Sequence, residues 1–180
     1  MTDRKSSTDT VSISGHVKGV IFDVSLIRDR SPIWDALTRE QRHSVLSSGL
    51  ADDAVVRVIE CDNLVLDTYL ESLAAGSSPI PDDLAFGDGL DDPQPTNTAL
   101  NNEVHRTFVG DVDHDGAQML TSTLLSQSEA NGESINEVGL ASGDLLTHRV
   151  LDEPDRIDEK TGNMAIIWNY LIDFGREGES

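Results

Sequence analysis

The chain has 180 residues, of which 37% are hydrophobic and only eight are aromatic, and its formal charge is -20 at pH 7. A chain of this length can bury a sizeable core, and a core made mainly of Val, Ile and Leu favours strands. The 33 Asp and Glu residues outnumber the 13 Lys and Arg residues. This balance argues against a protein that binds nucleic-acid phosphates through clustered cations, so no nucleic-acid partner is expected.

The acidic residues are spread along the chain, from Asp3 to Glu179, and lysine occurs only at Lys5, Lys18 and Lys160. A diffuse negative surface is typical of proteins that work in molar salt, because salt screens the repulsion between carboxylates. The composition therefore favours a halophilic source, and an ordinary acidic protein is the alternative.

Cys61 is the only cysteine, so no intrachain disulfide can form. The chain contains no run of about 18 apolar residues, so no transmembrane helix is expected. The polar start of the chain, Met1 to Asp9, lacks the apolar stretch of a signal peptide. We expect synthesis in the cytoplasm and no membrane insertion.

Hydrophobic patterning and turn residues divide the chain into five parts. Residues 1–10 are expected to be a disordered or extended N-terminus, and residues 11–76 an N-terminal strand and helix segment. Residues 77–103 form a connecting region rich in Pro and Asp, residues 104–174 an antiparallel β-domain, and residues 175–180 a tail. The predicted fold class is α+β, mainly β, with an antiparallel β-sandwich-like C-terminal domain after an N-terminal segment containing two helices.

Capping residues locate the two predicted helices. Ser31 followed by proline is a typical helix start, and either Asp62 or Asn63 is positioned to cap a second helix that ends at Gly76. Alternating or continuous apolar residues predict strands elsewhere. The expected strands lie at residues 11–27, 53–61, 104–112, 118–125, 133–140, 145–151 and 164–174, with a hairpin turn at 113–116, a turn at Asn131-Gly132 and a short strand at 84–86.

Several short motifs follow one another in a fixed order after residue 55. They are Asn63 before apolar residues, Phe86-Gly87-Asp88-Gly89, the polar element from Thr98 to Arg106, Glu137-Val138-Gly139-Leu140, and Lys160 before the last apolar run. In this order and spacing they resemble a β-domain found in tail, baseplate and fibre-attachment proteins of tailed viruses. The resemblance covers about two thirds of the chain, and the first gap of the Thr98 element is tighter here than in that family.

The resemblance implies a non-enzymatic structural protein in the tail of a virion, with no cofactor, in a virus that infects a halophilic archaeon. Its expected place is the tail tip or baseplate, or an adaptor that attaches tail fibres. Expected partners are other tail proteins and copies of the chain itself, as a trimer or a ring of three- or six-fold symmetry. The alternatives are a capsid turret or decoration protein and a carbohydrate- or receptor-binding module.

Physical roles can be predicted for some of the motif residues. Gly87 and Gly89 are expected to adopt positive φ angles. Glu137 is expected to form an ion pair with Arg106 that fixes strand register, while Asn63 and Gly139 mark further structural positions of the motif. The free edges of strands in the ranges 104–125 and 164–174 are candidate contact surfaces.

Asp111, Asp113 and Asp115 precede Gly116 at the alternate positions with which an EF-hand calcium loop begins. The loop's last ligand position holds Ser122 instead of glutamate, so a hairpin turn is favoured and a site for Ca2+ or another cation is the alternative. The five histidines lack metal-site spacing. Acid pairs such as Glu133 with Glu137 arise by chance in so acidic a chain, and no nucleophile or nucleotide motif is present, so an enzyme is not expected.

Overall fold

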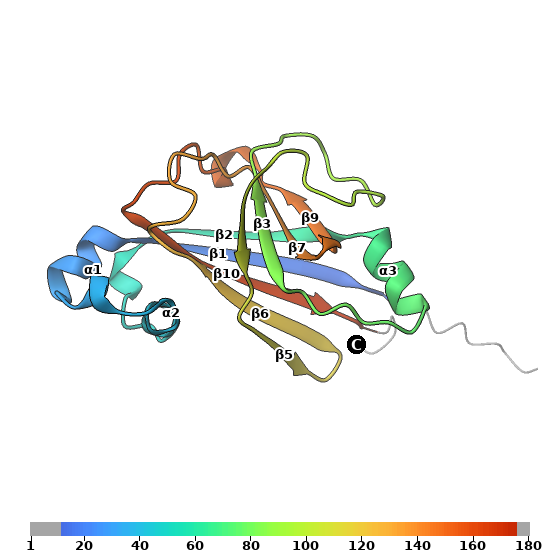
Figure 1. Cartoon of the computed structure of the whole chain (residues 1–180), viewed down its shortest axis with the longest axis horizontal. Coiled ribbons are helices and arrows are strands. Elements are labelled where there is room, and N and C mark those ends of the chain that lie inside the picture. Colours follow the sequence, from blue (N-terminus) through green and yellow to red (C-terminus); the bar gives the residue numbers. More distant parts are fainter. Residues whose placement is uncertain (1–11, 176–180) are drawn as a thin grey trace, which may run out of the picture.

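The computed structural model describes residues 12–175, which form a strongly curled antiparallel sheet with short helices at its ends (Figure 1). The predicted N-terminus at 1–10 and all of the predicted tail except Gly175 lie outside the described residues. The strands are β1 (Ser14–Asp23), β2 (Val55–Val65), β3 (Asp83–Gly87), β4 (Glu103–Phe108), β5 (Asp111–Asp115), β6 (Gln118–Leu125), β7 (Glu137–Ser142), β8 (Asp144–Leu145), β9 (Thr147–Val150) and β10 (Met164–Asp173). The α-helices are α1 (Val24–Arg30), α2 (Arg39–Ser47) and α3 (Asp67–Ala74), and 3-10 turns cover Trp34–Ala36, Asp52–Ala54 and Glu153–Asp155.

All the strands belong to one sheet, in the order β4-β3-β7-β9-β2-β1-β10-β6-β5, with β8 paired to β7. The predicted mainly β, α+β class is confirmed. The strands expected to build a sandwich instead follow one another around a single curl. In this sheet β1 and β2 lie between β9 and β10, so the N-terminal segment supplies the centre of the sheet instead of preceding a separate β-domain.

The curl brings the short strands β3 and β7 across the long strands β1, β10 and β6, and the main core fills the space between them. Leu84, Phe86 and Val138 on the short strands are fully buried. Phe86 packs against Trp168 of β10, with ring centroids 5.9 Å apart. Burying large apolar side chains of this kind stabilises a fold by about 2–3 kcal/mol each.

A second core lies on the other face of the long strands, under α1 and α2. Trp34 and Leu46 from the helical layer pack there against Phe22 and Ile167. This layer covers one end of that face only. The remaining part of the same face, nearer the start of β1, stays open.

The helices begin at other residues than the sequence suggested. Asp23 caps α1, a short helix. The predicted strand at 11–27 is therefore too long, because the apolar residues Val24 to Ile27 begin this helix. Thr38 caps α2 through a complete capping box with Gln41. The helix predicted from Ser31 is therefore divided into a 3-10 turn and α2. Asn63 continues β2 instead of capping α3.

The hairpin between β5 and β6 is confirmed, with a tighter turn than predicted. β5 continues to Asp115 and pairs with Gln118, so the turn consists of Gly116 and Ala117. Gly116 has φ +60°, a conformation that favours glycine. Gly76 likewise has φ +78° just beyond α3, in agreement with its predicted role as the helix stop.

Side chains join the two ends of the curled sheet. Arg39 of α2 donates to Glu129 at 2.8 Å and to Thr107 of β4 at 2.7 Å, and Thr107 also donates to Glu129 at 3.0 Å. Burial favours the neutral acid, but hydrogen bonds from Ser126 and Arg39 outweigh it and lower the pKa of Glu129 from 4.5 to about 2. We call Arg39, Thr107 and Glu129 the clasp, because they hold β4 beside the segment that follows β6.

Candidate functional site

Glu137, the first residue of β7, is the centre of a buried polar cluster. Its carboxylate accepts hydrogen bonds from the backbone N–H groups of Gly89 (3.1 Å), Asn101 (3.0 Å) and Asn102 (2.8 Å). The side chain is completely buried. Burying it favours the neutral acid, but hydrogen bonds from His148 and from these backbone groups keep the pKa of Glu137 below its ordinary value.

His148 of β9 completes this cluster and is also fully buried. Its Nε2 lies 2.8 Å from Glu137 Oε2, and its Nδ1 lies 3.1 Å from Asn97 Oδ1. The same Asn97 oxygen accepts a hydrogen bond from the backbone N–H of Gln94, so it faces His148 as an acceptor. His148 is therefore the side chain that pairs with Glu137 inside the fold, and Asn97 holds its other ring nitrogen.

Gly87 and Gly89 serve this cluster by leaving room for it. A Cβ atom at Gly87 would lie 2.6 Å from the Asn102 carbonyl oxygen and would also clash with Glu137 Oε1, and a Cβ at Gly89 would lie 2.6 Å from the same Glu137 atom. The predicted positive φ is wrong, because neither residue is among the positive-φ positions of residues 12–175. The glycines permit close approach instead of an unusual backbone angle.

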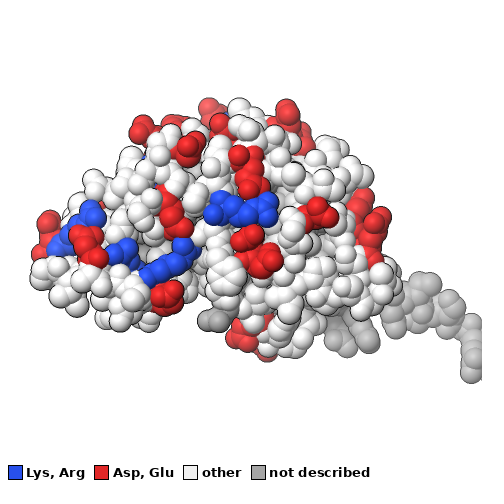
Figure 2. Space-filling model, in the orientation of Figure 1, with Lys and Arg blue, Asp and Glu red and all other residues white. Residues whose placement is uncertain are grey.

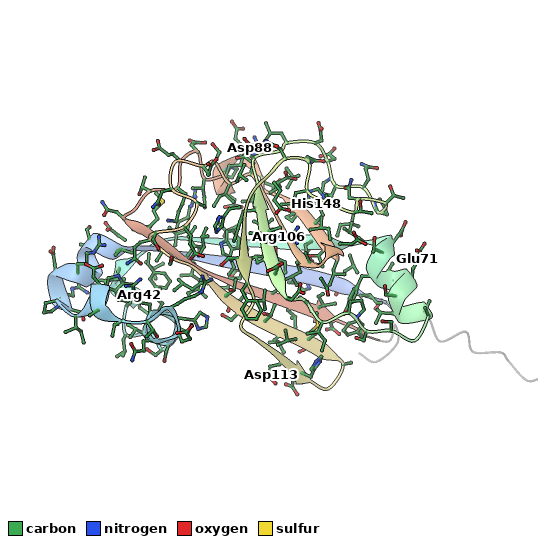
Figure 3. The ribbon with its side chains drawn as sticks, in the orientation of Figure 1. Arg42, Glu71, Asp88, Arg106, Asp113 and His148 are labelled. Carbon is green, nitrogen blue, oxygen red and sulfur yellow. The ribbon has the colours of Figure 1, made fainter. Side chains whose placement is uncertain are left out.

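The predicted pair between Glu137 and Arg106 is also wrong. Arg106 of β4 makes a bidentate ion pair with Glu103, at 2.8 and 2.9 Å, and its Nη1 lies 3.6 Å from Asp83. Its side chain is on the surface side of β4, in the middle of the view in Figure 3. That pairing was predicted from residue types and their order in the motif, whereas in the structure Glu137 contacts His148 of the neighbouring strand β9.

The remaining motif residues lie apart from Glu137's hydrogen bonds. Gly139 of β7 lets the carbonyl oxygen of Thr147 approach, because a Cβ at this position would clash with that oxygen. Asn63 of β2 lies against Gly15, and its nearly buried side-chain amide has no hydrogen-bond partner within residues 12–175. Both positions therefore depend on close packing between neighbouring strands.

Asp111, Asp113 and Asp115 form part of the extended strand β5 instead of a loop between helices. The side chain of Asp113 is exposed and accepts a hydrogen bond from the next backbone N–H at 2.8 Å. No group of three or more His, Cys, Asp or Glu side chains in the described part of the chain is placed to hold a metal ion. The cation site stays a prediction that calcium calorimetry in high salt would test.

Lys160 is the second motif residue that carries charge inside the protein. Its side chain is fully buried and donates to Thr161 O at 3.0 Å and to Asn131 Oδ1 at 3.3 Å. Burial lowers the pKa of Lys160 to about 8, and the carboxylate of Glu129 acts in the opposite direction. The lysine ties the loop before β10 to the loop after β6.

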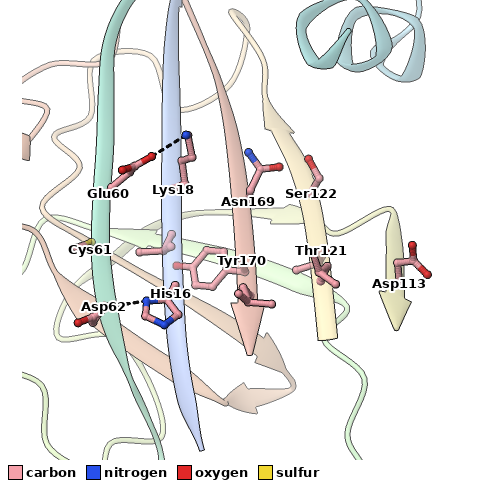
Figure 4. Close-up of a pocket in the computed structure, with 13 residues that line it drawn as sticks. His16, Lys18, Glu60, Cys61, Asp62, Asp113, Thr121, Ser122, Asn169 and Tyr170 are labelled. Atoms are coloured by element: carbon pink, nitrogen blue, oxygen red, sulfur yellow. Dashed lines mark ion pairs between the residues drawn. The ribbon is translucent and has the colours of Figure 1, made fainter. Parts of the chain in front are cut away.

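An open groove of about 720 Å³ crosses β2, β1, β10, β6 and β5 (Figure 4). Along β1, His16 and Lys18 are exposed and alternate with Val17, which belongs to the main core. His16 and Lys18 therefore lie on the outer face of the sheet, beside the area covered by the helices. We call this cavity the outer groove.

Strand register arranges the outer groove in two rows. The first row runs Glu60, Lys18, Asn169, Ser122, and Figure 4 shows these four side chains abreast. The second row runs Asp62, His16, Leu171, Leu120, Asp113.

Polar contacts organise the groove at both ends. Lys18 Nζ lies 2.6 Å from Glu60 Oε1, and His16 Nδ1 lies 2.5 Å from Asp62 Oδ1. At the boundary with the helical layer, His43 Nε2 lies 2.9 Å from Ser122 Oγ. These groups provide a polar, hydrogen-bonding surface around two leucines.

Acidic side chains are spread over the face shown in Figure 2, while Lys and Arg gather over the helices and in the middle of that view. Most of these arginines are already paired. Arg28 binds Asp35 at 2.9 Å, and Arg30 contacts Asp53. The positive residues therefore neutralise neighbouring acids and leave no broad basic surface on this face.

The sequence analysis missed His148 and every residue of the outer groove apart from Asp113. The available signal for His148 was its place between Leu146 and Val150 at alternate positions of a predicted strand, where a polar side chain on an apolar face needs a partner. For the groove, alternation in each strand was visible, but residues that stand abreast, such as Lys18 and Asn169, come from strands about 150 residues apart in the sequence. Their alignment depends on register, which composition does not encode.

Residues 12–175 contain no helix long and apolar enough to cross a membrane. Comparison of the chain with protein-family models, with curated proteins and with solved structures finds no match.

Proposed function

We propose that the protein is a non-enzymatic structural component of the virion of a tailed virus with a halophilic host. Its place would be the tail tip or baseplate, as a component or as an adaptor for tail fibres. Its partners would be other tail proteins and further copies of the chain in a trimer or a three- or six-fold ring. The same resemblance suggests a β-sandwich-like module, in which the two parts of the curled sheet that face each other across the main core would act as the two layers.

The observation that carries this proposal is the meeting of the motif residues. Gly87, Gly89 and Glu137 lie on segments separated by about fifty residues of sequence, yet they are in direct contact. The charged residue at the centre of this motif, Glu137, is enclosed and is therefore not open to a substrate. A motif that holds distant segments together in this way supports a structural role. The order of motifs after residue 55 supports the particular family.

The sheet also offers an edge for assembly. Among the described strands β5 pairs only with β6, so its second edge is free. The edge predicted at 164–174 is wrong, because β10 pairs with β1 on one side and β6 on the other. Strand addition at β5 is the mode of contact that this arrangement favours.

Quantitative mass spectrometry of virions, separated into tail and capsid fractions in high salt, tests the proposal. We expect the protein in the tail fraction at a low copy number per particle. Recovery with capsids would replace the tail assignment by a turret or decoration role. Absence from both fractions would refute a virion role.

A further inference from the structure

We infer that the outer groove binds a basic, partly apolar peptide segment of a partner protein. Its walls are acidic, its floor is apolar, and both ends of its rows are open to solvent. This inference deepens the proposed function in one respect, since it gives the chemistry of the partner. The binding itself can be tested without any virus particle.

Carboxylates stand on both walls of the groove. Glu60 and Asp62 project from β2, and Asp113 projects from β5, four strand spacings away, which is about 19 Å. Lys18 is the only permanently positive side chain among the groove residues described here, and it is engaged by Glu60 at 2.6 Å. Three carboxylates against one ammonium leave the groove negative, so a positive ligand is favoured.

The floor between these walls combines Leu120 and Leu171 with hydrogen-bonding neighbours. Leu120 is 39% exposed, a large fraction for a leucine on a strand. Asn169 and Ser122 stand beside the two leucines in the adjacent row. A peptide that alternates basic and apolar side chains could cover the leucines and reach both walls with its cations.

A second hollow of about 510 Å³ continues the groove past His16 and Asp62, which line both cavities. Asn63 lines this hollow too, and its nearly buried amide lacks a hydrogen-bond partner in the described residues. The amide itself is enclosed against Gly15, so it takes no part in binding, and the hollow simply lengthens the groove.

The negative charge of the protein also determines which kind of ligand the outer groove favours. A second copy of the chain would bring a further formal charge of -20, and an anionic membrane surface would be repelled in the same way. A basic segment of a partner protein is instead attracted by the negative electrostatic field of the chain. In a salt-rich environment the leucine floor would retain part of the affinity that screening removes from the charges.

The probe is a fluorescein-labelled, capped heptapeptide of alternating lysine and leucine, followed by anisotropy in 0.2 M and 2 M KCl. We expect saturable binding to the whole chain, and loss of binding when glutamate replaces the lysines. The double variant Glu60→Gln, Asp113→Asn should weaken binding about tenfold, and Leu120→Ser at least about threefold in both salts. The matched control Glu71→Gln, Asp92→Asn removes two exposed carboxylates outside the groove and should change binding less than twofold. Circular dichroism checks that each variant is folded.

Equal weakening by the control pair would show diffuse attraction to an acidic protein and overturn the inference. Absence of binding by the wild-type chain would overturn it as well. If the peptide does not bind and Leu120→Ser turns an oligomer into a monomer in light scattering, the groove holds a second copy instead. None of these results depends on where the protein is found in a virion, so the groove and the tail assignment can fail separately.

Discussion

At the scale of single residues, Glu137 shows how a carboxylate can be buried in this acidic protein. Three backbone N–H groups and His148 satisfy it, and Gly87 and Gly89 provide the space. A buried charge without such partners would be strongly destabilising. The cluster therefore depends on glycine at both positions as much as on the groups that donate hydrogen bonds to Glu137.

Gly87→Ala should lower the free energy of unfolding by about 2–3 kcal/mol, because the new methyl group clashes with Glu137 and with the Asn102 carbonyl. Gly110→Ala is the matched control, since a Cβ there meets no atom within 4 Å. The control should be neutral or stabilising by up to about 1 kcal/mol. Urea denaturation of the two variants measures both values, and equal losses would contradict the close-approach role of Gly87.

The partner of Glu137 can be identified with double-mutant cycles. Glu137→Gln should cost about 3 kcal/mol, because the amide replaces a buried carboxylate that accepts hydrogen bonds from three backbone N–H groups and contacts His148. Glu137→Gln with His148→Gln should give a coupling energy above about 1 kcal/mol. The cycle with Arg106→Ala should be additive within about 0.5 kcal/mol, as Arg106 is bound to Glu103. Strong coupling to Arg106 would restore the pairing that the sequence suggested.

At the scale of secondary-structure elements, the clasp holds the two ends of the curled sheet together. Arg39 belongs to α2, Thr107 to β4 and Glu129 to the turn after β6. Strands β4 and β6 also meet directly, because the hydroxyl of Thr123 in β6 donates to the carbonyl oxygen of Phe108 in β4 at 2.8 Å. The hydrogen bonds of the clasp therefore stabilise the curled form of the sheet.

The clasp predicts an acid-dependent loss of stability. The pKa of Glu129 falls from 4.5 to about 2 on folding, so its contribution is complete above pH 4.5 and is lost as the pH falls toward 2. The contribution above pH 4.5 is about 3 kcal/mol. Glu129→Gln should be less stable than the wild-type chain at pH 7, and the difference should vanish near pH 2. Denaturation curves from pH 7 to 2.5 measure this.

Glu133→Gln, which changes an exposed acid nearby, is the control for that experiment. It should follow the wild-type chain at every pH. A constant difference between Glu129→Gln and the wild-type chain down to pH 2.5 would contradict the depressed pKa.

The elements show which parts of the fold were accessible from sequence. The strands with clear alternation, such as β6 and β10, and the turn glycines Gly76 and Gly116 were predictable from local patterns. α1 was not, because its apolar residues continue the pattern of β1 and only the cap at Asp23 marks the change. The placement of β1 and β2 at the centre of the sheet was equally hidden, since it depends on pairing between distant segments.

The candidate sites followed the same rule. Gly87, Gly89 and Glu137 were identified as related positions, but their mutual contact and the partner His148 required the register of β3, β7 and β9. The outer groove required the alignment of β2, β1, β10, β6 and β5 together. Local sequence reports the character of each residue, whereas a site made across strands is defined by long-range pairing.

At the scale of the whole molecule, the formal charge of -20 opposes the compact state, because folding concentrates the carboxylates. Raising KCl from 0.1 M to 2 M should increase the melting temperature by screening this repulsion. Sucrose of equal osmolality raises stability through exclusion without screening and serves as the comparison. A melting temperature that is the same in both KCl concentrations would contradict an adaptation to salt.

The first and last described strands, β1 and β10, are neighbours over ten residue pairs, from Ser14 opposite Asp173 to Asp23 opposite Met164. A ribosome that makes this chain releases β1 long before β10 exists, so the middle of the sheet cannot be completed until β10 has been made. During that interval the second edge of β1 in the β1–β2 pair stays unpaired, and closure over such a sequence separation is slow. The backbone of Ser12 also meets Gly175 at 3.0 Å, so a short linker could join these ends. A circular permutant opened in the turn after α3 would then place β10 directly ahead of β1, so that the two strands could pair as soon as β1 is made.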